Sequence, residues 1–199
     1  MKIGILISGR GSNMVAITEA VQNGFIPDSE VAIVISDKTQ AEGLLKAKAR
    51  GIDVMAVPRK RRPREEHDAE IISELRERKV ELVCLAGYMR LLSKSFVQAF
   101  PNKILNIHPS LLPSFPGLDA QKQAVEYGVK VSGCTVHFVD EHLDHGAIIL
   151  QKAVSVEDDD TAESLSGKII KFEHQTYVEA VKKIVSGDYE IIGRRVVFR

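Results

Sequence analysis

Residues 3–21 read IGILISGRGSNMVAITEAV and contain three local patterns in succession. The first, Ile3–Ile7, is a short apolar run rich in β-branched residues, which is typical of a strand buried on both faces. Ser8–Asn13 is a loop with two glycines, and from Met14 onward the apolar residues are spaced as in a helix. This order predicts a strand, a tight loop and a helix at the start of the chain.

The same order recurs along the first half of the chain. Short apolar runs alternate with stretches of helical spacing. Because strands that alternate with helices at this spacing pair in parallel through right-handed crossovers, we expect an α/β, Rossmann-like fold with a mostly parallel twisted sheet and helices on both faces. The expected strands are 31–35, 54–57, 80–86 and 103–107, and the expected helices are 41–50, 65–78 and 93–100.

Beyond Pro113 the pattern changes. Thr161–Ser164 has the form of a helix N-cap with a residue that can reach back to it, and a long amphipathic stretch follows to about Val185. We expect an antiparallel C-terminal portion and a single domain over 1–199, with a mononucleotide-binding half at 1–107 and a half at 108–199 that contains the long helix. The other expected elements are a helix at 120–127, strands at 132–139 and 147–154, and an edge strand at 196–198.

The composition excludes several classes of protein. With 199 residues, 44% of them hydrophobic, the chain can bury a full core. Its 27 basic and 27 acidic residues give a formal net charge of zero, so no overall field draws it to nucleic acid or to a membrane. Cys84 and Cys134 lie far apart in apolar runs, which argues against a disulfide framework or a zinc site. With no apparent signal peptide or membrane span, we expect a cytoplasmic protein.

The loop after the first strand has the features of an anion site. Glycines allow a tight turn, and the free N–H groups at a helix start point toward whatever binds there. Gly9 and Gly11 match the first two glycines of the dinucleotide fingerprint, but Met14 occupies the third position. We therefore favour a single phosphate at Gly11, Ser12 and Asn13; the alternative is a tight turn with a capping side chain and no ligand.

A second candidate site lies in residues 105–113, LNIHPSLLP. Residues two apart on a strand point to the same side, so Asn106 and His108 share one face at the end of a strand that Pro109 stops. An amide donor beside a histidine that can donate a proton is suited to stabilising an oxyanion during acyl transfer. The alternative is that Asn106 caps a turn and His108 is a hydrogen-bonded, half-buried ring.

Two further loops are candidates for ligand contacts. Residues 59–64, RKRRPR, concentrate five positive charges before a helix. Such a run is more often a solvated loop, and the absence of interleaved aromatic residues disfavours nucleic acid, but it could form a rim for an anionic small molecule. Gly87–Leu92 follows a strand and should lie beside the first glycine loop, because ligands bind at the carboxyl ends of parallel strands; the alternative is a loop that only packs on the core.

Residues 140–146, DEHLDHG, place three acids and two histidines in one loop. Metal ligation is one interpretation, but a polar hairpin tip accounts for the composition as well. We favour a different use, in which one carboxylate raises the pKa of a nearby histidine and holds it protonated near neutral pH. His137, in the preceding strand, is more often a packing residue than a catalytic one in such a place.

Four of these segments together resemble the folate-dependent formyltransferase family. They are GRGSN at 9–13, AGYMR at 86–90, LNIHPSLLP at 105–113, and Asp144 with Gly146. The glycine-serine-asparagine loop narrows the resemblance to the members that formylate glycinamide ribonucleotide in purine (IMP) synthesis. It extends from Met1 to about Val185, and implies 10-formyltetrahydrofolate as co-substrate, small-molecule partners, no metal, no nucleic acid, no membrane, and a monomer or weak homodimer.

The resemblance also implies a role for each matching residue. Asn106, His108 and Asp144 would be catalytic, supported by Ser110 and Thr135. Glu173 would hold the ribose or glycinamide end of the substrate whose phosphate lies at Gly11, Ser12 and Asn13. The folate would be bound by Arg64, Met89, Arg90, Leu91, Leu92, Asp140 and Asp144.

The expected mechanism is direct attack of the substrate amine on the formyl carbon. Neither cysteine has a histidine or basic neighbour in its motif to activate it, so an acylated enzyme is disfavoured. Two alternatives stay open: a formyltransferase that acts on a different amine, and a non-catalytic nucleotide-binding module that uses the glycine loop and Asp37.

Overall fold

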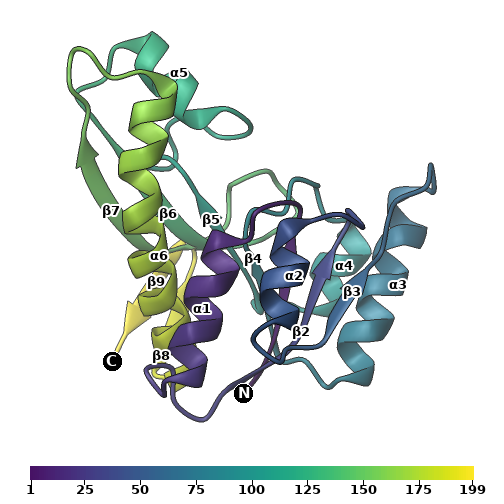
Figure 1. The fold of residues 1–199 in the computed structure, drawn as a ribbon. Helices are drawn as coiled ribbons and strands as arrows, with labels where there is room; N and C mark the ends of the chain where they lie inside the picture. Colours follow the sequence, from purple (N-terminus) through teal and green to yellow (C-terminus); the bar gives the residue numbers. More distant parts are fainter. The chain divides into compact units, whose positions relative to one another are not determined.

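The computed structural model describes residues 1–199, which divide into two compact units, Met1–Asn106 and Ile107–Arg199. Figure 1 shows the helices and strands of both units along the chain. The boundary falls within strand β5 (Ile104–His108).

The first unit is built on a parallel sheet in the order β3-β2-β1-β4-β5. All its strand pairs are parallel, and β1 is central because the chain first adds β2 and β3 on one side of it and then β4 and β5 on the other. Its strands are β1 (Lys2–Ile7), β2 (Glu30–Ser36), β3 (Val54–Ala56), β4 (Leu82–Leu85) and β5; its helices are α1 (Ser12–Gln22), α2 (Glu42–Lys48), α3 (Arg64–Glu77) and α4 (Lys94–Ala99).

The apolar runs of the sequence form the core of this unit. The side chains of Ile3, Ile5, Leu6 and Ile7 are fully buried, as expected for a strand covered on both faces. Helix α1 packs beside α2, and α3 packs beside α4. The parallel βα arrangement predicted from the first half of the sequence is confirmed.

The second unit contains a mixed set of strands and one long helix. Strands β6 (Val131–Phe138) and β7 (Ile148–Ser155) are antiparallel, whereas β7 pairs with β9 (Arg195–Phe198) in parallel. Helix α6 (Ala162–Ser186) packs against β6, β7 and the short helix α5 (Ala120–Tyr127). The antiparallel C-terminal portion expected from the sequence is present.

The ends of α6 follow the sequence signals. The Thr161 hydroxyl accepts the backbone N–H of Ser164 at 3.1 Å, and the Ser164 hydroxyl accepts that of Thr161 at 2.9 Å, which forms a capping box. Gly187, at φ 78°, ends the helix in the left-handed conformation that favours glycine. The predicted start and end of this helix are therefore confirmed.

One strand was not predicted. Strand β8 (Tyr189–Ile192) forms an antiparallel hairpin with β9, joined by Gly193 and Arg194. It has only four residues, and its side chains alternate between partly and fully exposed, so it lacks the continuous apolar run that marks the central strands.

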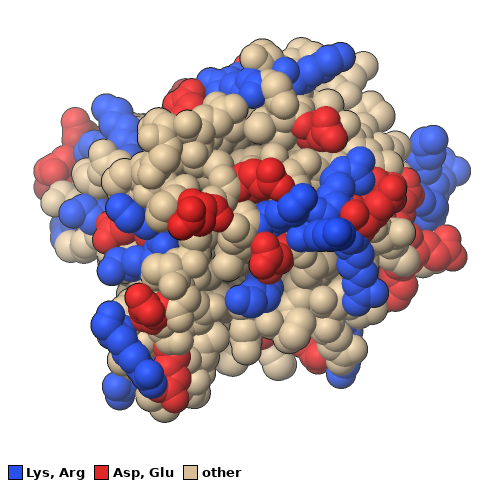
Figure 2. Space-filling view, turned by 90° about the horizontal axis from the view of Figure 1, so that it is seen from below, with Lys and Arg blue, Asp and Glu red and all other residues tan.

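The distribution of surface charge agrees with the formal net charge of zero (Figure 2). On the face seen in Figure 2, acidic and basic side chains lie next to one another across the surface. None of the helices combines the length with the apolar character that crossing a bilayer requires.

Candidate active site

In the first unit, the loops after β1 and β4 are joined directly. The backbone N–H of Ser8 donates to the Gly87 carbonyl at 3.1 Å, and the Ser8 hydroxyl accepts the backbone N–H of Met89 at 2.9 Å. These loops leave the sheet where the strand order reverses, which is where open α/β sheets bind ligands. The structure therefore brings Gly87–Leu92 beside the glycine loop.

The glycine loop presents an uncapped helix N-terminus. Gly11 has φ 68°, and a Cβ added there would lie 2.9 Å from the Gly43 Cα atom, so this position requires glycine. Helix α1 begins at Ser12 without a side-chain cap and without an acidic residue in its first turn. Asn13 is only 6% exposed. The backbone N–H groups of this turn can therefore donate hydrogen bonds to an anion.

The basic run divides into a structural part and an exposed part. Arg62 donates to Glu70 Oε2 at 2.5 Å and to the Pro58 carbonyl at 3.0 Å, which fixes it against α3. Lys60 and Arg61 are exposed and adopt left-handed backbone conformations. Arg64, also exposed, is the first residue of α3. The exposed charges remain available to an anionic ligand.

In the second unit, the imidazole of His108 lies between two acceptors. Its Nδ1 atom is 3.4 Å from Asp144 Oδ2, and its Nε2 atom donates to the Phe115 carbonyl at 2.8 Å. The side chains of His108 and Asp144 are 5% and 9% exposed. Each ring nitrogen therefore faces an oxygen atom in a buried site.

Asp144 is held by more than His108. Its Oδ2 atom accepts the backbone N–H of Gly117 at 2.8 Å, and its Oδ1 atom lies 3.8 Å from His137 Nε2. The backbone at Asp144 has φ 48°, a conformation that aspartate tolerates better than most residues. Burial lowers the pKa of His137, against the opposing effects of its bond to Phe138 and of Asp144. The His137 ring thus lies beside the Asp144 carboxylate. From the sequence, a packing role was the more common expectation for a histidine at this position.

A hydrogen-bond network supports the segment that follows His108. The Thr135 hydroxyl donates to the Ser110 carbonyl at 2.7 Å and accepts the backbone N–H of Leu112 at 3.0 Å. The Gln151 side chain donates to both the Thr135 hydroxyl and the Leu112 carbonyl, at 3.0 and 2.9 Å. Gln151 was not singled out from the sequence, because a polar residue on a half-exposed strand carries no specific signal.

The loop that carries Asp144 also contains a second group of titratable side chains. Asp140 Oδ2 lies 2.8 Å from His145 Nδ1, and Asp140 Oδ1 accepts the backbone N–H of His142 at 2.8 Å. Burial raises the pKa of Asp140, but the His145 and His142 hydrogen bonds outweigh it and hold the pKa below its usual value. Potential ligand atoms of these three residues lie within 4.8 Å of one another, so the set could hold a metal ion, although both histidines are exposed.

The remaining predicted residues lie on separate elements. Asn106 is a partly buried residue of β5 and ends the first unit, whereas Glu173 is buried in α6 of the second. Met89 and Leu91 are 65% and 52% exposed. Burial raises the pKa of the Cys134 thiol to about 11, against a lowering by the Thr176 hydrogen bond, so this cysteine is a poor nucleophile at neutral pH.

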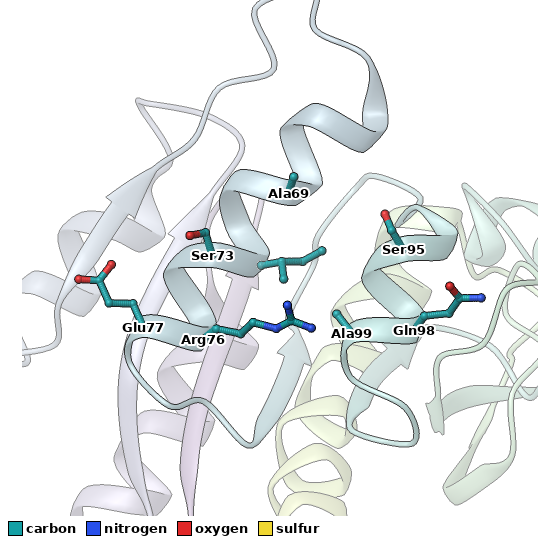
Figure 3. A pocket seen from close by; sticks show the side chains of 8 residues that line it. Ala69, Ser73, Arg76, Glu77, Ser95, Gln98 and Ala99 are labelled. Carbon is teal, nitrogen blue, oxygen red and sulfur yellow. The ribbon is translucent and has the colours of Figure 1, made fainter.

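A cavity in the first unit does not coincide with these residues. It has a volume of about 800 Å³ and lies between α3 and α4, lined by Ser73, Arg76 and Glu77 on one helix and by Ser95 and Gln98 on the other (Figure 3). None of the predicted site residues lines it. The chemistry expected from the sequence is therefore not located there.

Known proteins match this chain over most of its length. The curated relatives include the trifunctional purine biosynthetic protein adenosine-3 of Gallus gallus, 45% identical over 96% of this chain. They also include phosphoribosylglycinamide formyltransferase of Bacillus subtilis, 43% identical over 92% of this chain and 94% of its own length. The chain spans only 19% of the Gallus gallus protein and 14% of the Drosophila melanogaster one.

Solved structures and a family model give the same result. The crystal structure of glycinamide ribonucleotide transformylase 1 from Symbiobacterium toebii has a TM-score of 0.97 and 50% identity, covering 100% of this chain and 93% of that one. Phosphoribosylglycinamide formyltransferase from Anaplasma phagocytophilum has a TM-score of 0.92 at 45% identity, covering 100% and 94%. The sequence model described as Formyl transferase matches residues 1–181. The chain therefore belongs to the formyl transferase family.

Proposed function

We propose that the protein transfers the formyl group of 10-formyltetrahydrofolate to the amine of N1-(5-phospho-D-ribosyl)glycinamide, a step of de novo purine biosynthesis. The observation that carries this proposal is the buried contact of His108 Nδ1 with Asp144 Oδ2 at 3.4 Å in a chain of the formyl transferase family. Relatives that bear the name phosphoribosylglycinamide formyltransferase support the substrate assignment.

The proposed chemistry is a direct transfer. The glycinamide nitrogen attacks the formyl carbon, and the carbonyl oxygen becomes the oxyanion of a tetrahedral intermediate. Asn106 donates a hydrogen bond to that oxygen, and His108 donates its Nε2–H to it in place of the Phe115 carbonyl, which accepts from Nε2 in the free protein. Each donor is worth about 3–4 kcal/mol to the transition state. Asp144 faces the other ring nitrogen, with its Oδ2 atom 3.4 Å from Nδ1, and orients the imidazole. When the intermediate collapses, the bond to folate nitrogen breaks, and a water molecule carries the proton from the attacking amine to that nitrogen.

The substrate's phosphate is assigned to the N-terminus of α1. The uncapped first turn and the left-handed Gly11 support a small anion at Gly11, Ser12 and Asn13. We assign the ribose or glycinamide end to Glu173. Because the first unit has an incomplete dinucleotide fingerprint, a monophosphate fits this loop better than a pyrophosphate.

We assign the folate to residues that combine exposed apolar groups with positive charge. Met89 and Leu91 provide apolar surface, and Arg64 provides a cation for a carboxylate. The assigned residues are Arg64, Met89, Arg90, Leu91, Leu92, Asp140 and Asp144. The co-substrate is 10-formyltetrahydrofolate, and no metal takes part.

The assembly and location are proposed on the same basis. The family match from 1 to 181 supports one formyltransferase domain formed by both units. We propose a cytoplasmic monomer or weak homodimer whose partners are small molecules, with no role for nucleic acid or membrane.

A direct assay tests the proposal. The protein is mixed with 10-formyltetrahydrofolate and glycinamide ribonucleotide, and deformylated folate is followed by absorbance. We expect turnover by the wild type and a loss of at least a hundredfold in kcat for Asn106→Ala and His108→Ala, since each removes an oxyanion donor. His174→Ala, on α6, is the histidine control. Turnover only with a different amine, or stabilisation by NAD(H) without turnover, would overturn the assignment.

A further inference from the structure

A buried pair of titratable residues in the first unit is not used by the proposed chemistry. His67 and Asp68 occupy the first turns of α3 and are 0% and 1% exposed. Charged side chains are rarely buried to this extent unless partners satisfy them. The groups that bond to His67 and Asp68 therefore indicate the role of the pair.

The imidazole of His67 lies between two acceptors. Its Nε2 atom donates to the Val57 carbonyl at 2.7 Å, and its Nδ1 atom lies 3.3 Å from Asp68 Oδ1. Each ring nitrogen of His67 thus faces an oxygen atom. The other carboxylate oxygen, Asp68 Oδ2, accepts the backbone N–H of Ser93 at 2.6 Å. The pair thus makes one bond to each of two loops.

The first of these loops leads to Arg64, and the second contains Met89–Leu92, all of which are assigned to folate. Val57 follows β3 and precedes the basic run, which leads into Arg64 at the start of α3. Ser93 ends the loop that contains Met89–Leu92, and its hydroxyl caps α4 by accepting the backbone N–H of Phe96 at 3.2 Å. Because His67 and Asp68 follow Arg64 within its own helix, the pair connects that arginine to both loops.

The apolar residues of the second loop cannot fix its position by packing alone. Met89 and Leu91 are largely exposed, so they bury little surface against the core. The loop is held at one end by the bond from Met89 to Ser8 and at the other by the bond from Ser93 to Asp68. Removing the second anchor leaves the Ser93 N–H without its acceptor and weakens the attachment at that end.

We propose that His67 and Asp68 are positioning residues for the folate co-substrate, which hold Arg64 and the Met89–Leu92 loop in the conformation that binds it. This inference rests on the proposed function. In this role the pair supports folate binding and does not contact the reacting atoms. Loss of the pair therefore weakens folate binding, whereas the chemical step and the binding of the ribonucleotide are retained.

Steady-state kinetics of Asp68→Ala tests the proposal, because the methyl group cannot accept the backbone N–H of Ser93. We expect the KM for 10-formyltetrahydrofolate to rise at least tenfold, with kcat and the KM for glycinamide ribonucleotide within about twofold of wild type. Calorimetric titration with tetrahydrofolate should show a matching loss of affinity. Equal effects on both KM values, a fall in kcat alone, or no effect would overturn the inference.

Two further variants separate positioning from general stability. Ser93→Ala removes the α4 cap but keeps the backbone N–H that binds Asp68, so the folate KM should stay at the wild-type value. His67→Leu loses the bond to the Val57 carbonyl, so it should raise the folate KM, and it carries the test if Asp68→Ala does not fold. Absence of turnover by the wild type would instead refute the proposed function.

Discussion

The Nδ1 atom of His108 lies 3.4 Å from the Oδ2 atom of Asp144, although the two residues belong to different segments of the second unit. A main-chain loop fixes both, since the Phe115 carbonyl accepts from the ring and the Gly117 N–H donates to the carboxylate. The orientation of the imidazole is thus set from two sides.

Asp144→Asn should lower kcat by roughly a hundredfold or more, because the amide can still accept the Gly117 N–H but no longer provides a negative charge beside His108. Steady-state kinetics with both substrates measures the effect. Asp158→Asn, which changes an exposed carboxylate, is the control and should be neutral. A wild-type kcat in Asp144→Asn would contradict the role given to this pair.

Gly11→Ala should destabilise the protein by about 1–2 kcal/mol, since alanine is strained at φ 68° and its Cβ would meet Gly43. Urea unfolding measures this change. Gly9→Ala is a matched control, because its Cβ would meet nothing within 4 Å, and its stability should stay within about 0.5 kcal/mol of wild type. Gly11→Ala should also raise the KM for the ribonucleotide. An unchanged KM for the ribonucleotide would show that its phosphate does not bind at this loop.

Asp160 should stabilise the start of α6 in a pH-dependent manner. Hydrogen bonds from Lys168, the Glu157 backbone N–H and Ser164 lower its pKa to about 2 from the usual 3.8. A lowered pKa means that the stabilisation is complete above the usual value and is lost as the pH falls toward 2. Asp160→Asn should therefore have a lower Tm than wild type at pH 7, and the difference should shrink between pH 4 and pH 2.

Calorimetry across that range measures the Tm difference for Asp160→Asn. Asp159→Asn, at an exposed neighbouring carboxylate, should show no pH-dependent difference from wild type. A Tm difference for Asp160→Asn that stays constant down to pH 2 would show that the carboxylate charge is not responsible.

Removal of divalent metals should leave formyl transfer unchanged. Asp140, His142 and His145 form a group that could hold an ion, but Asp140 already accepts the His142 N–H and lies 2.8 Å from His145. The assay is repeated after dialysis against EDTA. A metal requirement would be established if EDTA abolished turnover, zinc restored it in the wild type, and zinc failed to restore it in His142→Ala.

Local sequence patterns predicted most of the first unit because its elements have strong local signals. The run Ile3–Ile7 is fully apolar and buried, and Gly11 requires the left-handed conformation that only glycine adopts freely. In contrast, β8 is short and half-exposed, so its pairing with β9 depends on tertiary contacts that no local pattern records.

The contacts within the candidate site were harder to predict. The spacing of Asn106 and His108 on a strand is a local property, but no spacing relates His108 to Asp144, and the family resemblance alone indicated that relationship. His137 lies two residues after Thr135 on β6, and alternation along the strand would have placed both on one face.

The His67–Asp68 pair had a signal that could have been used. The buried residues of α3 include His67, Asp68, Ile71, Ile72 and Leu75, which recur at helical spacing. A histidine and an aspartate at the start of an apolar stripe are in positions that face the core. Their partners, Val57 and Ser93, lie in other loops and could not be inferred from the sequence.

The loop at 114–117 contacts the catalytic pair through its main chain: the Phe115 carbonyl binds His108, and the Gly117 N–H binds Asp144. Neither contact uses a side chain of this loop. Substitutions that tolerate the left-handed backbone at Phe115 and Gly117 would therefore leave the pair in place, whereas deleting one residue would shift both peptide groups at once. In this segment the number of residues is under stronger constraint than their identity.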